Sequence, residues 1–187
     1  EGRCGLIGTL GAGYPEALDP ATHTTPDAIS VHGLLSRFVR NGAASVCMEV
    51  SSHALDQGRV QGVAFDVAVF TNLTRDHLDY HGTMQHYAAA KTRLFEFTGL
   101  RAAVINRDDE LGRALIEKAA RRIKVVSFGF EQGDVRATRV VPATDGLTLD
   151  VVTPQGEISL RSPLLGRFNA ANLLAVLAVL LEGGMDL

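Results

Sequence analysis

A run of polar and ionisable residues at positions 71–82 contains the side chains best suited to chemistry. Its sequence is Thr-Asn-Leu-Thr-Arg-Asp-His-Leu-Asp-Tyr-His-Gly, and it follows the apolar stretch 66–70, which predicts a short buried strand. In open α/β sheets, ligands bind where a strand ends and a loop begins. Asp76, His77 and Asp79 offer the oxygen and nitrogen atoms that ligate metal ions. A solitary histidine in a loop is usually only solvated, but the whole run favours a metal and phosphate site.

Glu49 is a second candidate, because it lies near the carboxyl end of another expected strand, 45–50. Burying a carboxylate is costly unless it is paired or binds a metal. A structural ion pair, or a glutamate exposed at the end of the strand, would explain Glu49 as well, and Ser51 and Ser52 could simply cap the next turn. The expected position of the His77 loop on the adjacent strand favours the functional interpretation.

Lys91 belongs to an expected helix, 84–97, that we predict to be capped by Thr83. A lysine on a helix is by default a charge that faces solvent. The preceding turn contains the small residues Ala88 to Ala90, however, which would allow another backbone or a ligand to approach. From the helix alone, the solvent-facing interpretation is favoured.

Two expected helix starts could bind a ligand. Residues 22–25, Thr-His-Thr-Thr, precede a helix, where free N–H groups and the helix dipole attract anions. Thr25 fits equally well as a plain helix cap. At the start of the last expected helix, Asn169 could be the cap, but Asn172 one turn later suggests that two amides face one ligand.

The composition sets limits on size and partners. With 187 residues, of which 46% are hydrophobic, the chain can bury one well-filled core and a small appendage. Its net charge of −3 argues against a nucleic-acid partner, which would usually require a basic face. The most apolar segment, 173–181, is shorter than the roughly 20 residues of a membrane span. We therefore expect a buried helix there and no membrane partner.

Two cysteines, Cys4 and Cys47, are too few for a disulfide framework. They lie in apolar, strand-like surroundings, so we expect buried free thiols in a cytoplasmic protein. The chain enters a strand almost at once and finishes just after a helix. We therefore expect a domain cut from a longer protein.

The elements that position these residues alternate between strands and helices through most of the chain. This alternation predicts an α/β protein with a mostly parallel sheet and helices on both faces. Turn signals at 145–146 and 154–156 predict a small antiparallel sheet within 124–162. The expected strands are 3–9, 45–50, 66–70, 102–106, 124–128, 135–141, 147–152 and 157–160. The first expected helix starts at Thr25–Pro26, and its apolar stripe consists of Ile29, Leu34, Leu35, Phe38 and Val39. The other expected helices are 84–97, 109–121 and 169–181. Residues 10–24 are expected to form a loop.

Together, these segments resemble the central ATP-binding domain of the Mur ligases, the ATP-dependent amide-forming enzymes of peptidoglycan synthesis. The resemblance is carried by residues 23–26, 48–53, 72–82 and 87–91 and covers nearly the whole chain. It implies a P-loop NTPase-like α/β fold and a monomeric, cytoplasmic ligase. The segments most resemble the member that adds the third amino acid, meso-diaminopimelate or L-lysine, to UDP-N-acetylmuramoyl-L-alanyl-D-glutamate. That reaction uses ATP and passes through an acyl phosphate.

The resemblance also implies a role for each matching residue. Glu49 would bind the Mg²⁺ that bridges the β- and γ-phosphates of ATP, and His77 would help to hold a second Mg²⁺. Lys91 would react with CO₂ and become a carbamate, an anion that orients metal and the transferring phosphate, so for Lys91 the resemblance overrides the solvent-facing interpretation. The implied substrate-binding residues are His23, Thr24, Thr25, Ser51, Gln57 and Arg59, and the implied nucleotide-binding residues are Asn72, Asn169 and Asn172.

The sequence departs from the family pattern in two respects. The Gly-rich phosphate loop of the family would lie just before Glu1, and the family's amino- and carboxy-terminal domains would lie outside these residues. We therefore expect this stretch to be inactive by itself. In addition, His23 stands where asparagine is common in the family.

Two other functions compete with this one. A folylpolyglutamate synthetase shares the fold and the carbamylated lysine, but it is not expected to combine residues 24–26 with Ser51-Ser52-His53. A non-catalytic binding module is the alternative from another class. The intact set of Glu49, His77 and Lys91 argues against that for a full-length parent, although it fits this stretch alone.

Overall fold

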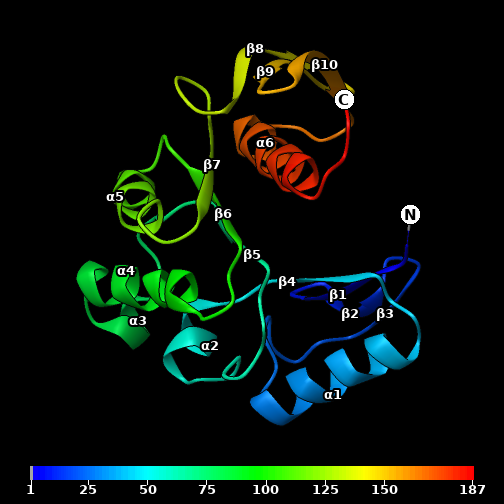
Figure 1. Ribbon diagram of the computed structural model, residues 1–187, viewed down its shortest axis with the longest axis vertical. Helices are drawn as coiled ribbons and strands as arrows, with labels where there is room; N and C mark the ends of the chain where they lie inside the picture. The colour runs from blue at the N-terminus through cyan, green and yellow to red at the C-terminus, as the bar shows by residue number, and fades with distance from the viewer. Residues whose placement is uncertain (1) are drawn as a thin grey trace. The chain divides into compact units, whose positions relative to one another are not determined.

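The computed structural model describes residues 2–187, which form two compact units. Unit 1 consists of the residues up to Val63 together with His77–Leu94. Unit 2 consists of Ala64–Asp76 and Phe95–Leu187. The colour ramp of Figure 1 shows that each unit draws on two separate stretches of the chain. The segment 64–76 therefore leaves unit 1, contributes a strand to unit 2, and returns.

Unit 1 contains a four-stranded sheet with the order β3-β2-β1-β4. Strands β1 (Cys4–Gly8) and β4 (Ser45–Met48) pair in parallel, while β1, β2 (Gly11–Tyr14) and β3 (Ala17–Asp19) pair antiparallel. The prediction of a loop over 10–24 is therefore wrong, because β2 and β3 form a hairpin there. A Cβ atom added to Gly13 would lie 2.4 Å from the backbone oxygen of Ala17. Glycine at position 13 permits the two strands to pair closely, whereas in the sequence alone a glycine is also typical of a loop.

Helix α1 (Ala28–Arg40) packs against this sheet through Phe38, which contacts Ile7 and Ala12. Its N-cap is Asp27, whose carboxylate accepts a hydrogen bond from the backbone N–H of Ser30, so the predicted start at Thr25 is wrong. The predicted apolar stripe is also wrong in part. Ile29 and Val39 are exposed, and the buried positions of the helix are Val31 and Phe38, which are seven residues apart and therefore share one face.

Three short helices complete unit 1. Helix α2 (Ser52–Asp56) follows β4 and is capped by Ser51, and α3 (Leu78–His81) precedes α4 (Met84–Thr92). Thr83 caps α4 by accepting a hydrogen bond from the backbone N–H of His86, as predicted. A 3₁₀ helix, η1 (Arg93–Glu96), takes the place of the last predicted turn of this helix. Helix α4 packs on both α2 and α3, so the 77–94 stretch lies against the helix that follows β4.

Unit 2 contains a six-stranded sheet with the order β5-β6-β7-β8-β9-β10. Strands β5 to β8 pair in parallel and β8 to β10 pair antiparallel. The predicted α/β class is confirmed, although the parallel strands are divided between two sheets. The strand predicted at 124–128 belongs to the parallel part, since Val126 lies opposite Val104 of β6. The strands are β5 (Val67–Phe70), β6 (Ala102–Asn106), β7 (Lys124–Gly129), β8 (Val135–Ala143), β9 (Gly146–Thr153) and β10 (Gly156–Ser162).

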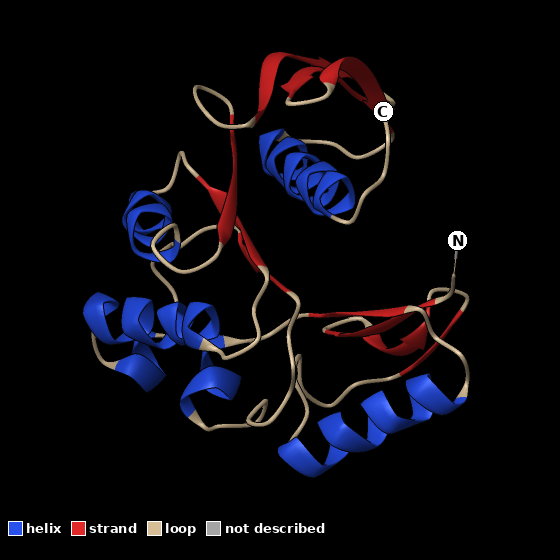
Figure 2. Ribbon diagram, viewed as in Figure 1, coloured by secondary structure: helices blue, strands red, loops and turns tan. Residues whose placement is uncertain are grey.

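Helices α5 (Glu110–Ala119) and α6 (Arg167–Glu182) lie on opposite sides of β6 and β7, as Figure 2 shows. Helix α6 buries an apolar face of leucine and alanine against the main core of unit 2. Its N-cap is Gly166 and not Asn169, which lies two residues inside the helix. No helix within residues 2–187 is long and apolar enough to cross a membrane.

The two cysteines are free thiols, as predicted, but they are not both buried. Cys4 is half-buried and Cys47 is exposed. Side chains alternate between the two faces of a strand, and the exposure of β4 alternates in the same way, with Ser45 and Cys47 on its exposed face. An apolar sequence context therefore did not determine which face Cys47 occupies.

Gly112 of α5 and Gly33 of α1 are both helical glycines, so replacing each by alanine tests how closely α5 packs against β6. A Cβ atom at Gly112 would lie 1.8 Å from the backbone oxygen of Asn106, whereas one at Gly33 of α1 would meet nothing within 4 Å. Gly33→Ala should stabilise the chain by about 1 kcal/mol through helix propensity. Gly112→Ala gains the same propensity but forces α5 away from β6, so we expect a net loss of about 1–3 kcal/mol. Urea unfolding of both variants checks this, and equal effects would contradict the close approach.

Candidate functional site

The buried hydroxyl group of Thr25 joins the loop before α1 to the end of β4. Thr25 is 1% exposed. Its Oγ1 donates a hydrogen bond to the backbone oxygen of Glu49 at 2.8 Å and accepts one from the backbone N–H of Ser51 at 3.0 Å. One side chain therefore satisfies two backbone groups at the point where β4 ends and α2 begins. The threonine that the sequence suggested as a cap or an anion contact serves here as a backbone bridge.

The carboxylate of Glu49 lies beside the end of β1. Its Oε2 accepts hydrogen bonds from the backbone N–H of Thr9 at 3.0 Å and from the Thr9 hydroxyl at 2.8 Å. Thr9 Oγ1 also lies 2.9 Å from Thr24 Oγ1. Glu49 is exposed, which fits both a surface glutamate at the end of a strand and an accessible ligand for a metal ion. The carboxylate is held by hydroxyl and amide groups rather than by a cation.

This donor set fits a magnesium ion in part. Mg²⁺ is usually held by one or two protein carboxylates, with phosphate and water oxygens completing its shell. Glu49 supplies one such carboxylate, with the hydroxyl groups of Thr9 and Thr24 beside it. An imidazole nitrogen is a less usual ligand for this metal. Within residues 2–187, no group of three or more His, Cys, Asp or Glu side chains is placed to hold a metal ion by itself.

A second group of candidate side chains consists of rings from α2, α4 and α3 with its N-cap. The rings of His53 and His77 lie 5.0 Å apart, and His53 lies 4.2 Å from the ring of Tyr80. The ring of His81 stacks on Tyr87 with a centroid distance of 5.1 Å and an interplanar angle of 19°. We call His53, His77, Tyr80, His81 and Tyr87 the ring cluster. It places His77 of the 71–82 run against the helix that carries Lys91.

His77 has an unusual backbone conformation. Its φ is 55°, and among residues 2–187 no other residue except glycine has a positive φ. His77 is also the N-cap of α3. Residues other than glycine rarely adopt this left-handed conformation, which costs energy and tends to occur at functional sites. The edge of its ring faces Tyr87 at a centroid distance of 5.7 Å. The conformation therefore supports His77 as a functional residue.

Lys91 is half-buried on α4, one turn after Tyr87. Its Nζ lies 5.2 Å from the centre of the Tyr87 ring, within the range of a cation–π contact. The side chain is thus directed toward the ring cluster and is not a freely solvated charge. Tyr87 is 5% exposed, so it forms a fixed wall beside the amine.

Gln57 and Arg59 line a surface hollow of about 540 Å³ together with His23 and the start of α1. The guanidinium group of Arg59 donates to Gln57 Oε1 from Nε at 2.8 Å and from Nη2 at 2.6 Å. Its Nη1 donates to the backbone oxygen of Thr25 at 2.8 Å. Arg59 is therefore oriented on two sides by acceptors that carry no full charge. Neither acceptor cancels its positive charge, although the carboxylate of Asp27, which is hydrogen-bonded to Ser30, also lines the hollow.

The three predicted nucleotide-binding amides lie in unit 2. Asn72 is exposed in the loop after β5, and this loop is fixed by the backbone N–H of Leu73, which donates to Asp109 Oδ2 at 2.8 Å. Asn169 donates from Nδ2 to the backbone oxygen of Leu165 at 2.9 Å, so its amide closes its own turn. Asn172 is exposed one turn later on α6. Their role as a joint nucleotide contact stays a prediction.

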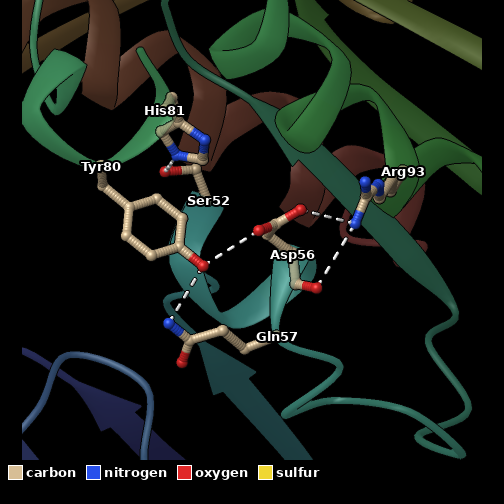
Figure 3. Close-up of polar contacts among 6 residues, drawn as sticks. All are labelled: Ser52, Asp56, Gln57, Tyr80, His81 and Arg93. Carbon is tan, nitrogen blue, oxygen red and sulfur yellow. Dashed lines mark hydrogen bonds and ion pairs between the residues drawn. The ribbon is translucent and has the colours of Figure 1, made fainter.

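Sequence reasoning missed several residues that this geometry brings in. Thr9 follows β1 and orients Glu49, and Asp56, Tyr80 and Arg93 form a polar network with Gln57 (Figure 3). Tyr80 lies inside the 71–82 run, so its position was a usable signal. Thr9 required knowledge of which strands pair, and Asp56 and Arg93 required knowledge of which helices pack together, and no local pattern supplies either.

The sequence profile of the Mur ligase middle domain family matches residues 1–180. The chain belongs to this family. It is 52% identical over 186 residues to the UDP-N-acetylmuramoyl-L-alanyl-D-glutamate--2,6-diaminopimelate ligase of Chromobacterium violaceum, and 53% identical over 188 residues to the ligase of the same name from Alkalilimnicola ehrlichii. Each match covers 99% of this chain and 38% of the relative.

Solved structures give the same family. A structure of a UDP-N-acetylmuramoyl-L-alanyl-D-glutamate--2,6-diaminopimelate ligase matches 99% of this Mur ligase middle domain with a TM-score of 0.91 and 40% identity. The folylpolyglutamate synthase of Mycobacterium tuberculosis matches 90% of the chain with a TM-score of 0.64 and 22% identity, a likeness that shows the fold alone. These matches cover 38% of each of those two chains. The chain therefore spans about 38% of the length of the curated relatives it matches.

His81 should make the stability of the domain depend on pH. It is 7% exposed, with Nε2 2.9 Å from the hydroxyl oxygen of Ser52. Burial lowers its pKa from the usual 6.5, and the nearby charge of His53 acts in the same direction, while Asp56 opposes it. The unfolded chain therefore takes up a proton at a higher pH than the folded chain. The stabilisation is complete above about pH 6.5 and is lost as the pH falls through the lowered pKa.

The comparison is between the unmodified chain and His81→Gln, which keeps a hydrogen-bonding partner for Ser52 but does not titrate. We expect the free energy of unfolding to fall more steeply from about pH 7 to about pH 5 in the unmodified chain. Urea titrations at several pH values give this slope. The same slope in both proteins would show that His81 is not the titrating group.

Proposed function

We propose that this chain is the middle domain of an ATP-dependent ligase that joins 2,6-diaminopimelate to UDP-N-acetylmuramoyl-L-alanyl-D-glutamate. The observation that carries the proposal is Glu49, an accessible strand-end carboxylate fixed by Thr9 beside Thr24 and the Thr25 bridge. Curated relatives with the same ligase name are about half identical to nearly all of this chain. Their identity over 99% of the chain supports the ligase over a non-catalytic module.

The hollow beside α1 is suited to the muramoyl-dipeptide. This substrate carries a diphosphate and carboxylates, and Arg59 presents a guanidinium group whose planar fork matches such anions. His23 and Gln57 line the same hollow, with Thr24, Thr25 and Ser51 in the adjacent loop and strand end. We assign these residues to substrate binding. The amides of Asn72, Asn169 and Asn172 are assigned to the nucleotide.

The reaction must activate a carboxylate, which is a poor acyl donor. Transfer of the γ-phosphoryl group of ATP to the D-glutamyl carboxylate would give an acyl phosphate, and the amine of diaminopimelate would then displace phosphate. Glu49, His77 and a carbamylated Lys91 would hold Mg²⁺, which when bound offsets the repulsion between the two reacting anions. Arg59 would hold the substrate's anionic end during both steps. We place the ligase in the cytoplasm, as a monomer, where ATP and UDP-linked substrates are available.

Carbamylation would convert Lys91 from a cation into an anion. The neutral amine forms a bond from Nζ to the carbon of CO₂, and the proton it loses passes to water. The half-buried position of Lys91 beside Tyr87 supports this role, and Ala88, three residues earlier on the same helix, is a small neighbour for the adduct. A carbamate adds two oxygen atoms, which are the ligands Mg²⁺ prefers.

The proposed function predicts the behaviour of two variants. In the full-length ligase, Glu49→Ala and His77→Ala should each lower the rate of tripeptide formation by at least about a hundredfold, because charge in the transition state loses its stabilisation. Coupled assays with ATP, Mg²⁺, muramoyl-dipeptide and diaminopimelate measure this. Circular dichroism should remain native-like, since both side chains are exposed. The absence of tripeptide with the unmodified enzyme would refute the function, and near-normal turnover of one variant would refute that residue's role.

Lys91→Ala tests the carbamate directly. The full-length variant should be nearly inactive and should regain activity when acetate or formate is added, because a small carboxylate can occupy the space of the carbamate. Lys91→Arg is the matched control: it keeps the positive charge, cannot form the carbamate, and should not be rescued. Full activity of Lys91→Ala would end this assignment.

A further inference from the structure

A continuous chain of polar contacts leads from Arg93 to Arg59 within unit 1, and Figure 3 shows its part from Arg93 to Gln57. At one end, Asp56 Oδ1 pairs with Arg93 Nη1 at 2.9 Å. The other carboxylate oxygen, Oδ2, accepts a hydrogen bond from the hydroxyl group of Tyr80 at 2.9 Å. The Tyr80 oxygen in turn accepts a hydrogen bond from Gln57 Nε2 at 3.1 Å.

The same glutamine completes the chain. Gln57 Oε1 accepts hydrogen bonds from Arg59 at Nε and Nη2, at 2.8 and 2.6 Å. Arg59 also donates to the backbone oxygen of Thr25. One amide group therefore stands between the tyrosine of α3 and the arginine of the substrate hollow, with its NH₂ end toward Tyr80 and its oxygen toward Arg59.

The direction of each hydrogen bond follows from the acceptor at the start of the chain. An ionised carboxylate only accepts, so Asp56 takes the hydroxyl hydrogen of Tyr80. The Tyr80 oxygen is then left as an acceptor, and it selects the NH₂ end of Gln57. The opposite amide orientation would bring that NH₂ against a guanidinium group, which only donates. Asp56 and Tyr80 thus reinforce, from the other end of the amide, the orientation in which the oxygen of Gln57 faces Arg59.

We propose that Tyr80 and Asp56 are positioning residues for recognition of the anionic substrate: they fix the amide of Gln57 so that its oxygen holds the guanidinium group of Arg59 in the hollow. This inference rests on the proposed function. Neither residue lines the hollow, so their effect on the substrate passes through Gln57. Because Tyr80 is 40% exposed, water partly replaces its hydroxyl group, and the effect of losing it is moderate.

The test is Tyr80→Phe in the full-length ligase. The KM for UDP-N-acetylmuramoyl-L-alanyl-D-glutamate should rise by about fivefold, the scale of one hydrogen bond, while kcat and the KM for ATP change by less than about twofold. Asp56→Asn should raise the same KM, because asparagine can present its NH₂ end and reverse the chain. Tyr14→Phe is the matched control. The Tyr14 hydroxyl is buried without a hydrogen-bond partner in the described part of the chain, and its loss should leave this KM unchanged.

Repeating Tyr80→Phe in a Gln57→Glu enzyme distinguishes positioning of the Gln57 amide from a general structural role of Tyr80. Both oxygens of a glutamate accept hydrogen bonds, so in Gln57→Glu either end of the side chain can face Arg59 and Tyr80 is not needed to orient it. Gln57→Glu will raise the KM by itself, since its charge partly cancels that of Arg59, but adding Tyr80→Phe should then have no further effect. If Tyr80→Phe left the KM unchanged, or raised it equally in both backgrounds, the inference would be wrong.

A readout without turnover keeps the inference separate from the function. The side-chain Nε–H signal of Arg59, observed by NMR in the 187-residue chain, should shift or broaden in Tyr80→Phe and remain unchanged in Tyr14→Phe. An unmodified enzyme that makes no tripeptide would refute the proposed function. An Arg59 signal that is the same in Tyr80→Phe and the unmodified chain would refute the positioning role, whatever the enzyme's activity.

Discussion

The arrangement of unit 1 around its functional side chains depends on the hydroxyl group of Thr25. Two backbone groups at the end of β4, the oxygen of Glu49 and the N–H of Ser51, have this single side chain as their partner. Burying them without a partner would cost about 1–3 kcal/mol each. The bridge therefore fixes the loop before α1 against the strand end. Thr24, the carboxylate of Glu49 and the cap of α2 take their positions from it.

From this anchor, two sets of side chains extend along the segment 51–57. Ser51 begins α2 by capping it, and Ser52 in the first turn meets His81 of the ring cluster. Asp56 and Gln57 at the other end of the helix meet Tyr80. One short helix thus contacts the helix after His77 at both of its ends. It is well placed to keep the hollow lined by Gln57 and Arg59 and the ring cluster in a constant relationship, even though five residues are too few for a helix to be stable in isolation.

The parts of this site that could be predicted are those that depend on strand ends. Glu49 follows an apolar strand, and the structure places it at an accessible strand end, because the end of a strand is visible as a change from apolar to polar residues. The cap of α1 was assigned to Thr25 instead of Asp27, because both residue types are good caps and only the buried backbone decides between them. The stacking of His81 on Tyr87 was invisible, since it depends on the angle between α3 and α4. The hairpin around Gly13 could not be predicted either, because glycine is typical both of loops and of strands that pair closely.

The charges along the polar chain explain why its central residue is a glutamine. Asp56 and Arg93 neutralise each other at one end, and Tyr80 and Gln57 carry no charge. Arg59 is consequently oriented by an amide oxygen and a backbone oxygen, so its full positive charge remains for the ligand. A carboxylate at position 57 would hold the guanidinium group more strongly but would cancel the charge that an anionic substrate needs. A neutral acceptor, however, has two ends, and only one of them can face a guanidinium group. The need for an oriented amide therefore follows from the need for an uncompensated arginine, and Tyr80 with Asp56 reinforces that orientation from the other end of the amide.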